Sequence, residues 1–484
     1  MSTHPSTAPP PISVRFARRS TRGLLLGFST PRVVAFGCAA AVAVAVLFVG
    51  GPMALVASGL VWVPLGAAVF VRVAGRPVVE WAGTAAHFGA RKAAGQAEFR
   101  ARVEKPRPAG TLALPGDAAS MRLHVDEGSG AAMVHDPHRQ TLSAVLSVSH
   151  PAFALLDDPD RSLRVSRWGR VIAQLAQSGT CAGLQVLEAT IPDPARSQTD
   201  WWVKHGRNDG RWAATQYQGL LDQVRLDSST HRTTISLSLD LRVVARAIKA
   251  AGRGIRGGAD VLRGDMACLT DALRQAGLRP LGWLGEADLA AIVRQAFDPA
   301  VEIDPSDPAA NLSHAGPVAI AESWQQLRHD SAWSSVLWVS EWPRIEVPPD
   351  FLHPLVFAPG VRRTLSVTSR PLPTDAALRQ IRRDKTEAVA DSAQKVRIGQ
   401  LADLSDAQEY DDLLARERSV ISGHTDVEFT GLLTVTALTP EALEVAVATI
   451  TRAAAQATCE VRPLYGRQMQ GFIAAALPLA RTTF

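Results

Sequence analysis

Residues 231–240, HRTTISLSLD, alternate polar and apolar side chains along most of their length. A period of two is typical of a half-buried β-strand. Residues 212–224 before this strand and residues 242–276 after it are predicted to be helical, and LRPLGWL at residues 278–284 has the pattern of a short closing strand. This part of the chain is therefore predicted to alternate strands and helices around a common core.

The same alternation extends in both directions. Upstream, strands are predicted at 142–150 and 181–190, with a helix at 162–177 between them. In the C-terminal half, strands are predicted at 336–342, 363–369, 427–438 and 459–464, and helical segments at 349–357, 374–420 and 440–457. Strand–helix–strand repeated within one unit predicts a split βαβ, ferredoxin-like sandwich.

The two halves also share local sequence. The first half has LRPLG at residues 278–282 and the second has VRPLYG at residues 461–466. Each is followed by an apolar helix that ends at a proline, Pro299 or Pro478. Matches in the same order favour an internal duplication, although chance similarity between alanine-rich helices would give the same pattern. We therefore predict an α+β fold with two related ferredoxin-like domains, residues 119–300 and 301–484.

Two apolar runs near the N-terminus carry no charged residue: VVAFGCAAAVAVAVLFV at residues 33–49 and MALVASGLVWVPLGAAVFV at residues 53–71. At a rise of about 1.5 Å per residue, each helix approaches the roughly 30 Å of a bilayer core. Only Gly50-Gly51-Pro52 separates the runs, so we predict a transmembrane helical hairpin over residues 33–71. The alternative, a signal peptide, is disfavoured by the long basic start and the immediate second run.

Charge predicts the orientation of this hairpin. Residues 1–107 hold 13 Lys and Arg but only 3 acidic residues, for a net charge of +10. These cations flank the hairpin and are absent from its turn, so the positive-inside rule predicts a basic cytoplasmic tail (1–32) and a basic cytoplasmic juxtamembrane linker (72–118). Because the whole chain carries +5, the rest carries −5, which disfavours direct nucleic-acid binding by the soluble part.

Patterns that would indicate catalysis are absent from the sequence. The four cysteines are far apart, no Gly-Lys pair exists to form a phosphate-binding P-loop, and neither HExxH nor Gly-x-Ser-x-Gly occurs. GRGIRGG at residues 252–258 is predicted to link two helices, and Asp136-Pro137 between His135 and His138 to form a turn. His424 and the three tyrosines lack a supporting pattern. We therefore expect no catalytic residue, metal ligand or cofactor, and no enzymatic activity.

Three surface features are each open to two interpretations. One aromatic cluster contains Trp201, Trp202, His205, Trp212 and Tyr217, and another surrounds a single strand with Trp324, Trp333, Trp338 and Trp342. Such side chains either anchor interfaces or fill cores. The third feature is the helical region 374–420, which is dense in charge and includes Arg382 and Arg383. It is either a solvated helical pair or a polar interface.

Residues 322–480 resemble the N-terminal, pre-ATPase domain of the VirB4/TrbE/CagE family of conjugation and type IV secretion ATPases. The matching segments are, in order, VLWVSEWPR, PPDFLHPLV, TLSVTSRPLP, LLTVTALTPEALEVAVATI and GFIAAALPLAR. In that family an ALP-type segment leads into the ATPase domain, whereas this sequence stops six residues after Pro478. The resemblance therefore implies the domain without its nucleotide site.

The whole chain more closely resembles an actinobacterial two-span membrane protein family that is likened to EccE of type VII secretion systems. The segment that carries this resemblance is residues 167–193, RWGRVIAQLAQSGTCAGLQVLEATIPD. This resemblance implies a non-enzymatic inner-membrane component of a type VII or conjugation-type secretion apparatus, a multi-pass protein with cytoplasmic soluble domains. Its expected partners are a separate VirB4-like or EccC-like ATPase and other membrane subunits, in a homo- or hetero-oligomer. The alternatives are a membrane-tethered enzyme of unknown class and a DNA-handling conjugation protein.

Overall fold

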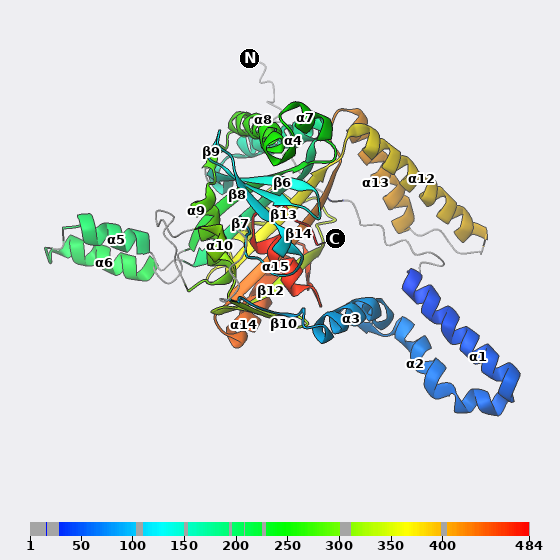
Figure 1. Cartoon of the computed structure of the whole chain (residues 1–484). Helices are drawn as coiled ribbons and strands as arrows, with labels where there is room; N and C mark the ends of the chain where they lie inside the picture. The colour runs from blue at the N-terminus through cyan, green and yellow to red at the C-terminus, as the bar shows by residue number, and fades with distance from the viewer. Residues whose placement is uncertain are drawn as a thin grey trace, which may run out of the picture. The chain divides into compact units, whose positions relative to one another are not determined.

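The computed structural model (Figure 1) describes residue 16 and residues 29–102, 110–149, 153–192, 196–207, 209–224, 229–300, 311–397 and 404–483. The chain divides into two compact units. The helical unit comprises Ala17–Ala97 and Lys385–Asp412. The sheet unit comprises Met1–Phe16, Glu98–Asp384 and Leu413–Phe484.

The helical unit begins with a bent apolar helix. α1 (Thr30–Ala57) is kinked at Gly51, whose φ of 69° lies in the left-handed region that glycine adopts without a steric penalty. Pro52 follows directly, and the chain then runs back through α2 (Gly59–Phe70). Figure 1 shows the resulting helical hairpin in blue.

One helix among the described residues has the length and composition of a membrane span. It covers Thr30–Ala54, 25 residues, and its side chains are largely exposed, with 85% of Phe48 and 92% of Val49 accessible. α2 has only 12 residues, about 18 Å of helix against the roughly 30 Å of a bilayer core. The predicted second span, 53–71, is divided between the end of α1 and α2 at Ser58. The structure therefore supports one candidate span where the sequence predicted two.

The predicted juxtamembrane linker, residues 72–118, contains regular structure. A short antiparallel pair, β1 (Arg72–Val73) and β2 (Arg76–Pro77), leads into α3 (Val78–Ala93). Glu80 in the first turn of α3 accepts a hydrogen bond from Ser29 Oγ (2.7 Å) and pairs with Arg32 (3.2 Å), which joins α3 to the start of α1. α3 contains several alanines, which are the strongest helix formers.

Among the described residues, the sheet unit is built on one 13-stranded sheet with the order β3-β10-β11-β12-β14-β13-β7-β8-β6-β5-β4, in which β15 also pairs with β12 and β9 with β6. The strands of the first half are β4 (Arg122–Val125), β5 (Ala132–Asp136), β6 (Thr141–Ser149), β7 (Cys181–Pro192), β8 (Ser229–Asp240) and β9 (Arg279–Trp283). The others are β3 (Glu98–Arg100), β10 (Ala319–Glu322), β11 (Leu327–His329), β12 (Ala332–Glu341), β13 (Arg362–Pro371), β14 (Val427–Ala437) and β15 (Glu460–Pro463).

The two halves of the sheet have the same pairing scheme. In the first half β9 pairs with β6, β6 with β8 and β8 with β7; in the second β15 pairs with β12, β12 with β14 and β14 with β13. The halves join where residues 184–190 of β7 pair antiparallel with residues 363–369 of β13. The predicted α+β class is confirmed, and the two predicted domains share one continuous antiparallel sheet.

Helices cover both faces of this sheet. On one face, α4 (Asp158–Ser178) and α8 (Gly254–Gln275) pack on the first half, and α11 (His353–Val356) and α14 (Pro440–Gln456) on the second. The opposite face is covered by α9 (Glu286–Phe297) and α15 (Gln468–Ala476). Successive strand residues face opposite sides: in β6, Ala144 and Leu146 join the core with α4 and α8, whereas Val145 joins the core with α9.

The strands predicted between residues 142 and 464 are all present within a few residues, apart from residue 150, which lies outside the described part of the chain. Five short strands of the 13-stranded sheet were not predicted: β3, β4, β5, β10 and β11. Each spans three to five residues, which is too short for a period of two to stand out from chance.

The chain after α15 is bound to the centre of the sheet through Gln185 of β7, which is fully buried. Its amide nitrogen lies within hydrogen-bond distance of three oxygens, Ser366 Oγ (2.8 Å), Ala474 O (3.0 Å) and Leu477 O (3.1 Å), and its amide oxygen accepts from Ala480 N (2.7 Å). One side chain therefore joins β7, β13 and the C-terminal segment.

An ion-pair cluster binds the same C-terminal segment at its next residues, 481 and 482. Arg481 is buried and pairs with Asp136 at the end of β5 (3.1 Å) and with Asp117 (3.0 Å). Arg139, in the turn after β5, donates to Thr482 Oγ1 (3.1 Å). A buried arginine with two carboxylate partners is stable where an unpaired one would not be, so this cluster closes the C-terminal segment onto the first half.

Replacing Gln185 with alanine is expected to lower the free energy of unfolding by about 2–4 kcal/mol, because the variant leaves buried polar groups without partners and opens a cavity. Denaturant unfolding of the detergent-solubilised full-length protein, followed by tryptophan fluorescence, measures the loss. Gln275→Ala, at an exposed position at the end of α8, is the control and should change stability by less than about 0.5 kcal/mol. Equal losses in both variants would contradict the assigned role of Gln185.

Candidate interaction surfaces

The first predicted aromatic cluster lies on a helical hairpin inserted between β7 and β8. The hairpin consists of α5 (Arg196–His205) and α6 (Trp212–Val224). The rings of Trp202 and Tyr217 are 4.5 Å apart between centroids and join the two helices. Trp201 and Trp212 are instead 57% and 78% exposed. The cluster therefore divides into a pair that stabilises the hairpin and two indoles available on its surface.

The charged region predicted over 374–420 is a second helical hairpin, inserted between β13 and β14. It consists of α12 (Thr374–Arg397) and α13 (Leu404–Ile421), and residues 398–403 lie outside the described part. Ala377, Ile381 and Val420 form a small buried cluster where the two helices meet. The predicted helical character of this region is confirmed for the described residues, and it is common to both the solvated pair and the polar interface.

Ion pairs reinforce the charged hairpin. Arg416 of α13 binds Asp426, just before β14, through two hydrogen bonds of 2.8 and 2.5 Å, and lies 3.7 Å from Asp384 of α12. Lys395 near the end of α12 pairs with Asp406 of α13 at 2.8 Å. Arg382 and Arg383 have exposed side chains on α12. The hairpin therefore has an ordered base and presents charge to its surroundings.

The two hairpins occupy equivalent places in the two halves of the sheet. Each connects two strands that are antiparallel neighbours, β7 with β8 and β13 with β14. Because β7 and β13 themselves run antiparallel, the hairpins leave the sheet at opposite ends. Figure 1 shows α5 and α6 in green and α12 and α13 in yellow-brown.

The second predicted tryptophan cluster is mostly part of the core. Trp333 and Trp342 are partly buried against the core of the second half, and Trp338 against the core that contains α15. Trp342 also contributes to an aromatic box with Phe351 and Phe429, into which Phe16 inserts with ring centroids 5.3, 5.7 and 5.6 Å away, respectively. Core packing is therefore the better interpretation for these three tryptophans.

Two motifs singled out in the sequence have structural roles. Asp136 Oδ1 accepts hydrogen bonds from the backbone N–H of His138 (3.1 Å) and Arg139 (3.2 Å), which forms the predicted turn between β5 and β6. Of the glycine-rich segment predicted to link two helices, only Gly252 and Arg253 lie between α7 (Ala245–Ala250) and α8, and residues 254–258 form the start of α8. A Cβ at Gly257 would lie 2.6 Å from Ile248 O, so glycine is needed there for close contact.

No group of three or more His, Cys, Asp and Glu able to hold a metal ion occurs among the described residues. A buried histidine that the sequence analysis did not single out, His329 of β11, has ordinary partners instead: Phe297 O at 2.6 Å and Ser334 Oγ at 2.7 Å. Desolvation by burial lowers the pKa of His329, so the neutral imidazole is favoured. Its role is to satisfy polar groups between α9 and β12.

Comparison with known proteins adds no family to this picture. No protein-family model matches the chain, and no curated protein matches it either. The resemblance to EccE and to the VirB4-type domain therefore rests on the sequence segments quoted above.

Two adjacent tryptophans of α5 test the division of the aromatic cluster. Trp202→Ala should open the α5–α6 hairpin, because it removes the Trp202–Tyr217 contact, whereas Trp201→Ala should leave it intact. Hydrogen exchange of residues 196–224 should accelerate by about tenfold or more in the first variant, as expected for a loss of more than about 1.4 kcal/mol of local stability. Faster exchange in Trp201→Ala as well would show that both indoles are structural.

Proposed function

We propose that the protein is a non-enzymatic, membrane-anchored component of a secretion apparatus of the type VII (EccE-like) or conjugation type, and that it docks a separate ATPase. The observation that carries this proposal is the pair of helical hairpins, one with exposed tryptophans and one dense in charge, on a sheet unit linked to a membrane-length apolar helix. Exposed indoles and charged helices are common at protein–protein interfaces.

We further infer that each half of the sheet unit is a ferredoxin-like split βαβ unit and that the halves arose by duplication. In both, the first strand lies between the fourth and third and the second strand is beside the third: β9-β6-β8-β7 and β15-β12-β14-β13. The LRPLG and VRPLYG segments coincide with β9 and β15, the equivalent fourth strands. This arrangement supports the relation to the pre-ATPase domain.

The proposed two-span anchor draws support from Phe16. This residue precedes α1, yet its ring lies among Trp342, Phe351 and Phe429, and its N–H donates to Pro343 O (3.1 Å). This contact supports a topology in which both sides of α1 in the sequence lie on the same side of the bilayer, as an even number of crossings would place them. The excess of cations on both flanks assigns that side to the cytoplasm.

Reporter insertions test this topology. A reporter fused after residue 110 should be active only as a cytoplasmic reporter, and one inserted after Gly51, in the turn, only as an exported reporter. A fusion after residue 110 that is active in the exported compartment would contradict both the two-span anchor and the cytoplasmic sheet unit.

The ATPase partner is tested by co-purification. Under mild detergent extraction from its native membrane, the protein should co-purify with a VirB4-like or EccC-like ATPase encoded at the same locus. The double variant Arg382→Glu/Arg383→Glu on α12 should weaken the association by about tenfold at low salt, and the difference should shrink as salt rises.

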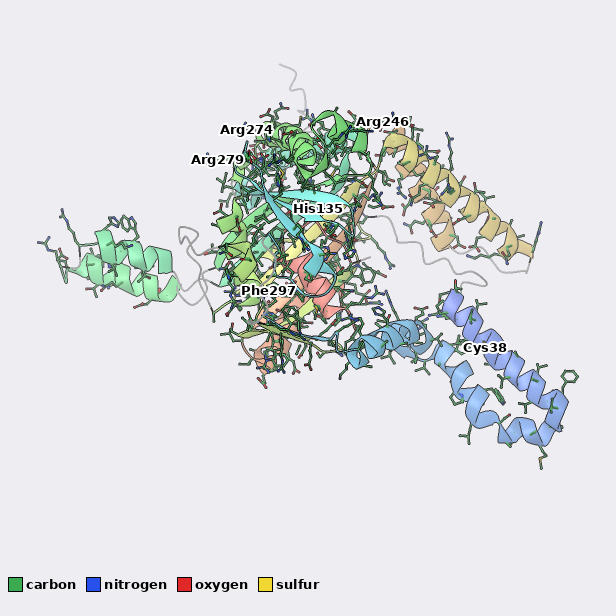
Figure 2. The ribbon with its side chains drawn as sticks, viewed as in Figure 1. Cys38, His135, Arg246, Arg274, Arg279 and Phe297 are labelled. Atoms are coloured by element: carbon green, nitrogen blue, oxygen red, sulfur yellow. The ribbon has the colours of Figure 1, made fainter. Side chains whose placement is uncertain are left out.

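The matched control is Arg274→Glu/Arg279→Glu, two exposed arginines at the end of α8 and in β9, labelled in Figure 2. These reversals change the net charge equally but lie on the first half, so they should leave co-purification unchanged. A native complex that contains no such ATPase would refute the docking role. Equal weakening by both double variants would refute the assignment of the surface to α12.

A further inference from the structure

Two arginines that are remote in sequence line one small cavity in the centre of the sheet unit. The cavity has about 400 Å³ of empty space including its open mouth, and its lining includes Arg232, Arg362, Thr434, Gln295 and Phe472. Gln295 belongs to α9 and Phe472 to α15. The cavity therefore lies on the sheet face that these two helices cover.

The strand register explains why the polar groups converge there. Arg232 of β8 pairs with Ala189 of β7, Ala189 with Thr364 of β13, and Thr364 with Thr434 of β14, so these residues form one row across four strands. Arg362 precedes Thr364 by two residues on β13 and therefore faces the same side. The pairing of β7 with β13, here called the seam between the two halves, runs through the middle of this row.

Arg232 and Arg362 are half-buried, and neither guanidinium group has a carboxylate partner among the described residues. Arg232 donates to Gln295 Oε1 (2.9 Å), a neutral acceptor, and its buried Nε has no hydrogen-bond partner among the described residues. No described carboxylate forms an ion pair with either Arg232 or Arg362. Burial and the neighbouring charge of Arg362 lower the pKa of Arg232 to about 10, and burial lowers the pKa of Arg362. Both effects oppose the charged form that arginine retains in proteins.

Two neighbouring charged side chains, Arg363 and Glu188, have hydrogen-bond partners outside this cavity. Arg363 also contributes to the cavity lining, but its two terminal nitrogens donate to backbone carbonyl oxygens, those of Ala358 (2.5 Å) and Val361 (2.9 Å) together with that of Val356, and only its Nε has no partner among the described residues. Glu188 accepts hydrogen bonds from His231 (3.1 Å) and Thr233. The carboxylate of Glu188 is therefore hydrogen-bonded to other groups, and the cavity keeps a net positive charge.

A buried hydroxyl provides an independent observation at the same cavity. Thr434 is 1% exposed, lines the cavity, and its Oγ1 has no hydrogen-bond partner among the described residues. An unsatisfied buried hydroxyl costs about 1–3 kcal/mol and is rare in native structures. Its neighbour Thr436, by contrast, is bonded to Ser334 (2.7 Å).

We propose that this cavity, here called the seam site, binds a small oxyanion of the phosphate class between Arg232 and Arg362, with the hydroxyl of Thr434 as a further donor. Guanidinium groups present planar sets of donors that match phosphate oxygens, and one bound anion would remove both their mutual repulsion and their desolvation cost. The phosphoryl group is either free phosphate or that of a small phosphate ester. This inference does not depend on the proposed secretion function.

The test measures phosphate binding to the detergent-solubilised full-length protein. Thermal unfolding is followed in sodium phosphate and in sodium chloride at equal ionic strength and pH, and calorimetric titration with inorganic phosphate gives the dissociation constant. The wild type should unfold at a higher temperature in phosphate, because a ligand that binds only the native state stabilises it. Arg362→Gln and Arg232→Gln should each weaken phosphate binding by about tenfold or more, as expected for loss of a charge-assisted contact.

Two further variants separate binding from structure. Arg246→Gln removes the same charge from an exposed position of α7, labelled in Figure 2, and should bind phosphate like the wild type. Thr434→Val keeps the shape but removes the unpartnered hydroxyl, so it should be at least as stable as the wild type in chloride and yet gain less stability from phosphate. If Thr434 had only a structural role, its replacement would not keep the stability in chloride and at the same time reduce the stabilisation by phosphate.

The source of the phosphoryl group is distinguished by competing ligands. Glycerol phosphate should bind as inorganic phosphate does if the seam site takes small esters, whereas tighter binding to vesicles that contain a phosphatidic acid than to free phosphate would assign a lipid headgroup. Either result supports the site. The absence of a phosphate-specific shift in the wild type, or dissociation constants that are equal in the wild type and in Arg232→Gln, Arg362→Gln and Thr434→Val, would overturn it.

Discussion

The backbone hydrogen bonds between β7 and β13 turn two strand units into one sheet. Without this ladder, residues 184–190 and 363–369 would each form the exposed edge of a separate sheet, with unpaired N–H and C=O groups that invite aggregation. Pairing the two edges with each other satisfies both. It also fixes the directions of the neighbouring strands, and with them the opposite ends at which the two helical hairpins leave the sheet.

The seam between β7 and β13 is polar on the face that α9 and α15 cover. Its polar groups have hydrogen-bond partners at one end and lack some of them at the other. At one end, Gln185 and Ser236 are satisfied by backbone groups of residues 474–480. The C-terminal segment thus supplies the partners that the strands lack. At the other end, beside Arg232 and Thr434, the lining consists of neutral and cationic groups. Since buried polar groups are almost always paired, the contrast between the two ends is the physical basis for assigning a ligand to one of them.

Strand positions could be predicted from the sequence because long strands carry enough residues to display their period. β8 and β14 are 12 and 11 residues long, and both were located closely. The hairpins β4–β5 and β10–β11 were missed because their strands are short. The kink that divides the apolar N-terminal region could be anticipated at Gly51, but the interruption at Ser58 could not, since serine within a helix has no strong conformational preference.

The partners of a side chain were the least predictable feature. Trp201 and Trp202 are neighbours in sequence, yet only Trp202 meets Tyr217, because consecutive residues on a helix point about 100° apart. Arg232 and Arg362 have no feature in common in the sequence, and Arg363 beside Arg362 looks like an equal candidate. Only the register across β8, β7 and β13 determines that Arg362 faces the cavity while the terminal nitrogens of Arg363 donate to backbone carbonyl oxygens.

The length of the helices also limits the membrane anchor. After the kink at Gly51, residues 52–70 are helical except at Ser58. A straight helix of this length would extend about 28 Å. That is close to the roughly 30 Å of a bilayer core, although α2 alone is far shorter. Residues 52–70 can therefore cross the bilayer only if the chain at Ser58 allows the end of α1 and α2 to align. The proposed two-span anchor therefore depends on the break at Ser58.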